Sequence, residues 1–226
     1  MTPVDWDRRI ARAAELESTY PAAAEMLRFY RAVASYQKQV YLLAPPDLPT
    51  LATLMAELQC VAERAGPAEL AGWAISLEQL EAFWRGEELE PAGTFFARAL
   101  LEPYAARLGG CPWGHHKPQA AILRPEGYAA KRSLVCALCS EEWPFPRVEC
   151  PACGEQDFDK LAVYTVPEFA HIRIDACESC RRYLKTVDLS KNGTAVPVVD
   201  ELAAVPLDLW AAEQGYVKMQ TNLLGL

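Results

Sequence analysis

The chain has 226 residues, of which 51% are hydrophobic and 23% are charged, so an intrinsically disordered chain is excluded. Lysine and arginine together number 22 against 30 aspartates and glutamates, which gives a formal net charge of -8. This balance argues against nucleic acid as a partner, because basic side chains supply most of that affinity. No stretch approaches the ~18 apolar residues of a membrane-spanning helix, and the acidic start of the sequence lacks the features of a secretory signal. We therefore expect a cytoplasmic protein without membrane insertion.

The first 109 residues have the periodicity of helices, because apolar side chains recur at intervals of three and four. We expect four helices, over residues 22–43, 49–65, 76–86 and 94–108. Ser76 is a candidate N-cap, and Gly109-Gly110 ends the last helix. Cys60 lies on an expected helix face and is interpreted as a small buried hydrophobe.

After Gly110 the pattern changes to short runs typical of β-strands. These runs cover residues 120–123, 131–135, 161–166, 171–175 and 183–187. A final helix is expected near residues 200–214, capped by Asp200 and bent or split at Pro206. The change of pattern places a domain boundary at about Gly109-Gly110.

Seven cysteines after residue 110 are arranged as an internal repeat. The first copy opens at Cys111-Pro-Trp-Gly114 and closes at Cys136-Ala-Leu-Cys139, and the second opens at Cys150-Pro-Ala-Cys153 and closes at Cys177-Glu-Ser-Cys180. Two residues between cysteines allow a tight turn to direct both sulfurs at one point, and two such turns supply four thiolates in a tetrahedron. In a reducing compartment this spacing is typical of metal binding rather than of disulfides.

The second copy predicts a complete metal site. Its ligands are Cys150, Cys153, Cys177 and Cys180. Four thiolates suit zinc and a single rubredoxin-type iron alike, so the sequence predicts iron or zinc, as one or two ions.

The first copy is incomplete, because Gly114 stands where the second copy has a cysteine. Either His115 or His116 completes a site, or the site is lost or labile and both histidines are solvated. The cysteines of this first site are Cys111, Cys136 and Cys139. A competing pairing joins the Cys136 pair to the Cys150 pair, but it ignores the repeat and leaves the last pair alone.

The residues around these cysteines resemble the formate dehydrogenase accessory protein family, also called formate dehydrogenase formation protein E. The stretches that carry the resemblance are Arg147-Val-Glu-Cys150-Pro-Ala-Cys153, Cys177-Glu-Ser-Cys180 with Tyr183-Leu-Lys185, Val199-Asp-Glu-Leu-Ala203, and Glu213-Gln-Gly-Tyr216. The resemblance implies two rubredoxin-like modules after a helical domain, with metal, reported as iron, on the paired motifs. It further implies a cytoplasmic protein that binds the catalytic subunit of a respiratory formate dehydrogenase and is needed for its activity. Gly114 departs from the family pattern, which has cysteine there.

The expected fold class is therefore α+β, with three parts. These are an all-helical N-terminal domain (1–109), a first rubredoxin-like or zinc-ribbon β module with an incomplete cysteine set (110–146), and a second such module with the C-terminal helix and tail (147–226). The expected function is that of a non-enzymatic accessory or maturation factor whose partner is the formate dehydrogenase catalytic subunit.

Two alternatives come from other functional classes. A zinc-ribbon module that binds nucleic acid needs a basic stripe, whereas the residues from 111 onward include 12 basic and 15 acidic side chains. A thiol–disulfide oxidoreductase places its Cys-x-x-Cys at a helix N-terminus, whereas these pairs lie on expected hairpin turns. No catalytic residue is therefore assigned.

Overall fold

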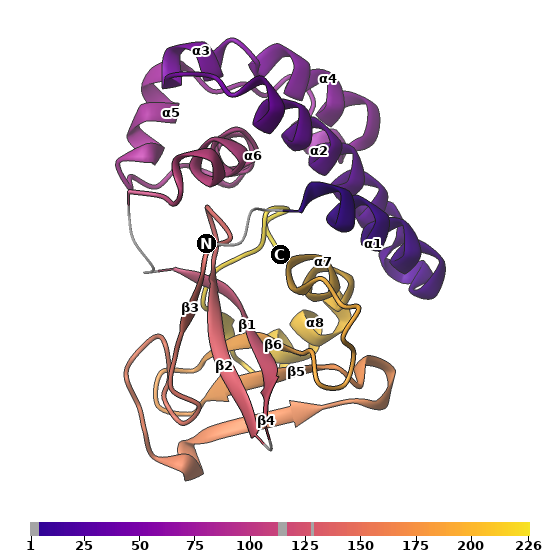
Figure 1. Ribbon diagram of the computed structural model, residues 1–226, viewed down its shortest axis with the longest axis vertical. Coiled ribbons are helices and arrows are strands. Elements are labelled where there is room, and N and C mark those ends of the chain that lie inside the picture. Colours follow the sequence, from indigo (N-terminus) through magenta and orange to yellow (C-terminus); the bar gives the residue numbers. More distant parts are fainter. Residues whose placement is uncertain (1–4, 113–116, 128) are drawn as a thin grey trace. The chain divides into compact units, whose positions relative to one another are not determined.

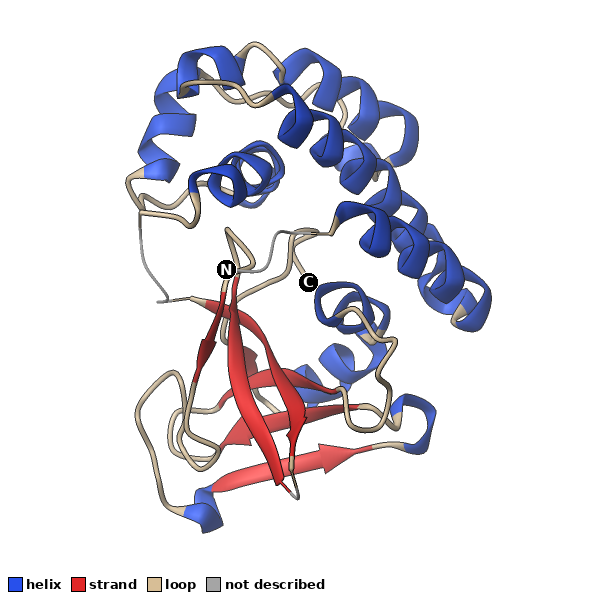
Figure 2. Ribbon diagram, viewed as in Figure 1, coloured by secondary structure: helices blue, strands red, loops and turns tan. Residues whose placement is uncertain are grey.

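The structure is a computed structural model that describes residues 5–112, 117–127 and 129–226 (Figure 1). The described chain divides into two compact units. One contains the N-terminal helices with Leu138–Glu141 and Leu223–Gly225, and the other contains the sheet with two C-terminal helices. Figure 2 shows this separation of helix from strand along the chain, which agrees with the α+β class. Among the described residues, no helix has both the length and the apolar character needed to cross a membrane.

The described residues of the helical unit form six α-helices. They are α1 (Trp6–Thr19), α2 (Ala24–Leu43), α3 (Leu48–Ala52), α4 (Met55–Ala65), α5 (Leu77–Trp84) and α6 (Pro91–Leu108), with 3-10 turns at Pro21–Ala23 and Ala68–Leu70. The single helix expected over residues 49–65 is divided into α3 and α4. At the division the Thr53 hydroxyl donates to the Thr50 carbonyl at 2.7 Å, a local bond that competes with helical pairing.

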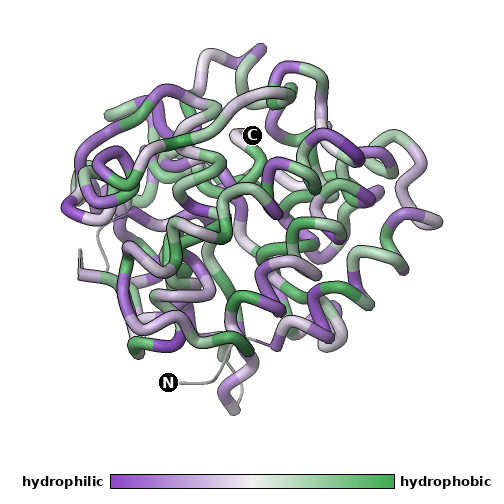
Figure 3. The backbone as a smooth tube through the Cα atoms, turned by 90° about the horizontal axis from the view of Figure 1, so that it is seen from above, coloured by the Kyte–Doolittle hydropathy of each residue, from purple (hydrophilic) through white to green (hydrophobic). Residues whose placement is uncertain are grey.

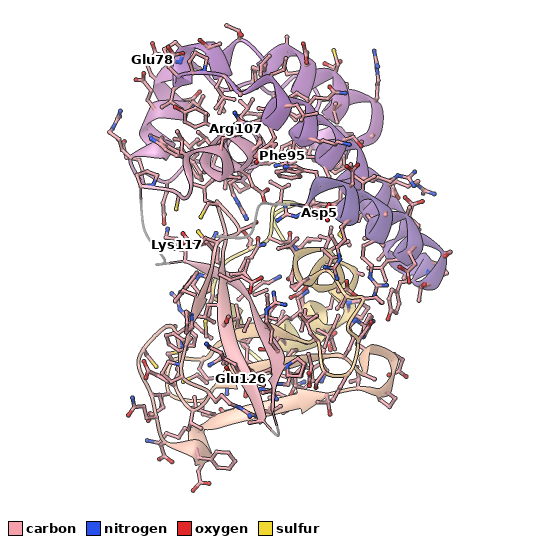
Figure 4. The ribbon with its side chains drawn as sticks, in the orientation of Figure 1. Asp5, Glu78, Phe95, Arg107, Lys117 and Glu126 are labelled. Atoms are coloured by element: carbon pink, nitrogen blue, oxygen red, sulfur yellow. The ribbon has the colours of Figure 1, made fainter. Side chains whose placement is uncertain are left out.

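The helix ends follow side-chain capping. Asp5, labelled in Figure 4, accepts a hydrogen bond from the Arg8 amide and starts α1. Ser76 and Gln79 form a reciprocal capping box at the start of α5, as the Ser76 prediction required. Gly109 ends α6 in the left-handed conformation, with φ of 83°.

Helix α4 buries one face, whereas α6 is buried on all sides from Phe95 to Ala105. Figure 3 shows hydrophobic and hydrophilic positions alternating along the chain. In α4 the buried residues are Met55, Leu58 and Ala62. Cys60 lies on the opposite side of this helix and is exposed, so the expectation that it is buried is wrong. The spacing of three and four does not include position 60 once Leu58 defines the buried face.

The second unit is built on one seven-stranded sheet. Its strands are β1 (Pro118–Glu126), β2 (Ala129–Cys136), β3 (Glu142–Pro144), β4 (Leu161–Thr165), β5 (Ile172–Cys177), β6 (Arg182–Asp188) and β7 (Val217–Lys218). The order is β3-β2-β1-β6-β5-β4, and β7 pairs with β6. The short strands β3 and β7 were not among the expected runs.

The repeat in the sequence corresponds to two antiparallel three-stranded arrangements, β1-β2-β3 and β4-β5-β6. Strands β1 and β6 pair in parallel, with Ala121 opposite Thr186, and so join both copies into one sheet. The domain boundaries at 109/110 and 146/147 stay predictions. Strands from both expected β modules belong to the same sheet.

Two helices, α7 (Pro197–Ala203) and α8 (Val205–Glu213), cover one face of this sheet (Figure 1). Pro206 occupies the first turn of α8, where its missing N–H costs nothing, so the expected helix is split there. Asp200 is not a cap, contrary to expectation, because it lies inside α7. Its carboxylate accepts from the Val196 amide at 2.7 Å and pairs with His171 at 2.8 Å.

The opposite face of the sheet has a smaller apolar cluster. Ala121, Leu134 and Leu184 are buried there. Trp143, Phe145 and Met219 pack against them and are only partly buried. Cys150 and Cys177 of the second copy lie on this same side of the sheet.

Candidate metal centre

The four cysteines of the second copy lie on two turns. Cys150 and Cys153 precede β4, while Cys177 ends β5 and Cys180 lies just before β6. Sγ of Cys150 is 3.7 Å from Sγ of Cys180, and Sγ of Cys153 is 3.7 Å from Sγ of Cys177. All four sulfurs lie within 4.8 Å of one another. A tetrahedral ion with metal–sulfur bonds of about 2.3 Å requires sulfurs about 3.8 Å apart, so this donor set fits zinc or iron.

The two turns have the same backbone geometry. In the first, the Gly154 amide donates to the Cys150 carbonyl at 2.9 Å, and in the second the Arg181 amide donates to the Cys177 carbonyl at 2.9 Å. The residue after the second cysteine is left-handed in both, with φ of 74° at Gly154 and 56° at Arg181. This reversal of the chain brings both sulfurs of a pair to the same side of the turn.

The sulfurs differ in burial. Cys150 and Cys177 are buried, whereas Cys153 is exposed. Burial raises the pKa of the Cys150 thiol to about 12. For Cys177 burial acts in the same direction, but hydrogen bonds from the backbone of Cys180 and Ser179 lower its pKa below the ordinary value. Because metal binds the thiolate, occupation of the site releases protons.

Side chains outside the cysteine motifs hold these turns. Glu155, next to the first turn, accepts a hydrogen bond from Ser179 in the second turn, and its backbone carbonyl accepts from the Cys150 amide at 2.9 Å. The Ser179 hydroxyl and backbone amides hold the pKa of the partly buried Glu155 at about 2. The two turns are therefore connected to each other even apart from the sulfurs.

Arg132, on β2 of the first copy, reaches the same region. Its Nη1 donates to the carbonyl of Glu149, the residue before Cys150, at 3.0 Å and to the carbonyl of Pro146 at 3.1 Å. Its Nη2 lies 3.4 Å from the carboxylate of Asp175. Arg132 was not found from the sequence, since it belongs to no cysteine motif. The sequence signal that could have indicated its role is its position as a basic residue within the expected strand 131–135.

The structure also brings together three cysteines of the first copy. The sulfurs of Cys111, Cys136 and Cys139 lie within 4.8 Å of one another, and two of these residues are buried. Cys136 and Cys139 therefore group with Cys111 rather than with the Cys150 pair. Gly114, His115 and His116 lie outside the described residues, so a histidine as fourth ligand stays a prediction.

The turn after Cys139 is held by a buried polar network. Ser140, left-handed with φ of 59°, donates to Glu102 at 2.8 Å. Arg9 donates to the same Glu102 oxygen at 2.7 Å and to Ser140 at 2.8 Å, and Gln37 donates to the other oxygen at 3.0 Å. Sequence reasoning missed this network, and its one local signal was an acidic residue within the apolar run of α6.

Comparisons with known proteins agree with this architecture. Residues 148–224 match the family model described as FdhE, C-terminal domain. A Protein FdhE homolog from Aquifex aeolicus is 38% identical over 116 residues, which is 51% of this chain and 41% of the relative. A Protein FdhE homolog from Pseudomonas aeruginosa is 31% identical over 201 residues, or 81% of this chain and 64% of the relative. The matched regions of the A. aeolicus relative and of one from Haemophilus influenzae are thus about two fifths of their lengths, 41% and 39%.

A solved structure extends the similarity to the whole chain. The crystal structure of the FdhE protein from Pseudomonas aeruginosa superimposes with a TM-score of 0.70 at 26% sequence identity. The superposition covers 99% of this chain and 97% of that chain. By sequence, family model and fold together, the chain is similar to FdhE proteins, over residues 148–224 by family model and over nearly its whole length by fold.

Proposed function

We propose that this chain is an accessory factor that binds the catalytic subunit of a respiratory formate dehydrogenase and is needed for its activity. The similarity to FdhE proteins supports the link to formate dehydrogenase formation. The observation that carries the proposal is the four-thiol centre, whose sulfur spacing of 3.7 Å suits a tetrahedral ion. We place this activity in the cytoplasm.

The metal in this proposal is iron or zinc. One ion is held by Cys150, Cys153, Cys177 and Cys180, and a second by Cys111, Cys136 and Cys139 with His115 or His116. Iron supplies a one-electron redox couple, whereas zinc acts as a structural cross-link. Because Cys153 is an exposed residue, the four-thiol centre lies at the surface, where a partner can reach it.

The chain acts in this proposal without catalysing a reaction itself. A redox Cys-x-x-Cys is activated at a helix N-terminus, which lowers the thiol pKa. Here Cys177 ends strand β5 and Cys180 lies just before β6, so this pair is not at a helix N-terminus. These surroundings support metal binding rather than disulfide exchange.

Two experiments test the proposal. The first is formate dehydrogenase activity in a strain that lacks this gene, complemented with wild type, with Cys177→Ser or with Cys60→Ser. We expect activity to require wild type or Cys60→Ser, because exposed Cys60 belongs to neither cluster. Unchanged activity in the deletion strain contradicts the proposal.

The second experiment is binding of the purified chain to purified catalytic subunit, with metal analysis and a visible spectrum of protein prepared without oxygen. Iron–thiolate absorption supports a redox-linked role, whereas colourless protein with zinc supports a structural one. Absence of a complex contradicts the proposed partner.

A further inference from the structure

A pocket of about 220 Å³ opens on the sheet face opposite α7 and α8. Cys150 and Cys177 line it, so it adjoins the four-thiol centre. Three of its lining residues are large hydrophobic side chains that remain exposed: Val148 at 45%, Phe158 at 75% and Val163 at 52%. Side chains of this kind gathered at one pocket are typical of an interaction site rather than of a free surface.

The pocket reaches the edge strand of the sheet, because Leu161, Ala162 and Val163 of β4 line it. Strand β4 pairs with β5 on one side, and no strand of the described chain pairs with its other side. Its sequence, Leu-Ala-Val-Tyr-Thr, contains no charged residue and no proline, the usual devices that prevent edge pairing. The backbone N–H and C=O groups of this edge are therefore available to an added strand.

The polar side chains of the pocket are mostly cationic. Arg132, Arg147 and Arg173 line it together with the carboxylates of Asp175 and Glu149. Arg173 binds Asp175 at 2.8 Å, whereas Arg147 donates to the Ala130 carbonyl over a longer 3.4 Å. Three guanidinium groups therefore stand beside two carboxylates in this pocket, in a chain whose net charge is -8.

Arg132 adds a second, independent observation. Its side chain is 3% exposed, and its Nε is buried without a hydrogen-bond partner among the described residues. A buried N–H without a partner is costly, so a donor left unpaired beside a pocket points to an acceptor from a ligand. The chemistry that satisfies it, next to Arg147, is a carboxylate.

We propose that this pocket binds an extended segment of a partner protein, which pairs with the free edge of β4. Apolar side chains of the segment pack on Phe158 and Val163, and an acidic side chain lies at Arg132 and Arg147. This inference rests on the proposed function, since it takes the formate dehydrogenase catalytic subunit as the source of the segment. The docked segment lies against Cys150 and Cys177, so partner binding and the metal centre share one surface.

The test compares binding of the full-length, metal-loaded chain to the purified catalytic subunit for wild type and surface variants. Phe158→Asp and Arg147→Glu change the apolar and cationic parts of the pocket. Leu209→Asp, at an exposed position on α8, and Lys191→Glu, at an exposed loop position, are matched controls. Metal content and circular dichroism of every variant show whether it is folded.

We expect both pocket variants to bind roughly tenfold more weakly or worse, and both controls to bind as wild type does. Hydrogen exchange provides a second readout, because strand addition protects the amides of β4 in the complex. Equal affinity of folded pocket variants and wild type overturns the docking surface and leaves the proposed function intact. Failure of wild type itself to bind overturns the proposed function, and the inference with it.

A second copy of this chain is the competing occupant. Sedimentation of the wild-type chain alone distinguishes it. A dimer that Phe158→Asp converts to monomer overturns the proposal in favour of self-association, whereas a monomer at the concentrations of the binding experiment supports it.

Discussion

Lys185 on β6 and Glu201 on α7 form an ion pair in the interior of the second unit, with Nζ and Oε1 2.9 Å apart. Both residues are fully buried. Lys218 also pairs with Glu201, and Asp208 accepts from Lys185 at 2.5 Å, so two ammonium groups face two carboxylates. Lys185 and Glu201 belong to two stretches that carry the family resemblance, and the fold gives them one shared role in fixing α7 and α8 on the sheet.

Removing one member of this network is expected to destabilise the second unit strongly. Lys185→Met leaves Glu201 and Asp208 with an uncompensated buried charge, which costs about 3–5 kcal/mol of unfolding free energy. Arg124→Met, which breaks the exposed pair with Glu142, is the control and costs about 0–1 kcal/mol. Urea denaturation measures both changes. Equal effects of the two substitutions contradict a structural role for the buried network.

The same network predicts sensitivity to acid. Burial alone raises the pKa of Glu201, but the ammonium groups of Lys185 and Lys218 outweigh it and hold this pKa at about 2, below the ordinary 4.5. A lowered carboxyl pKa stabilises the folded state above the unfolded value, and this stabilisation is lost as the pH falls from about 4.5 toward 2.

The measurement is unfolding free energy against pH for wild type and Glu201→Gln. We expect the difference between the two proteins to shrink as the pH decreases through this window, because wild type loses the ion pair that the variant already lacks. Since both proteins contain the same thiols, proton competition for metal affects them alike. A difference that stays constant from pH 5 to pH 2.5 refutes this role of Glu201.

Metal content is expected to follow the two cysteine clusters independently. Cys177→Ser removes one sulfur of the four-thiol centre and is expected to lose one metal equivalent, while the helical unit keeps its helical circular dichroism. Cys60→Ser is the control and keeps all metal. Loss of two metal equivalents in Cys177→Ser, or of none, shows that the sulfurs are not divided between two sites in this way.

Arg132 is expected to hold metal in place without touching it. Its bonds to the carbonyls of Glu149 and Pro146 fix the chain just before Cys150, so Arg132→Met is expected to release metal to a chelator about 10–100 times faster. Arg124→Met removes an exposed arginine of the neighbouring strand and is the control. Identical release rates for both variants exclude this positioning role.

Local sequence determined much of this fold. The capping box of Ser76 and the end of α6 at Gly109 depend on residues within four positions of each other, so short patterns predict them. The two cysteine turns are local for the same reason. Local patterns failed at two places. The Thr53 hydroxyl bonds to a nearby carbonyl and divides an expected helix, and Cys60, expected to be buried, is exposed.

The tertiary structure alone decided how the two copies are joined. Ala121 and Thr186 pair in parallel although they are 65 positions apart in the sequence, and no periodicity within either copy encodes a partner that distant. The burial of Lys185, the orientation of Arg132 toward the Cys150 turn and the free edge of β4 all follow from that pairing and from the helices packed on it. Spacing determined which thiols belong to one turn, whereas long-range strand pairing and burial determined what surrounds them.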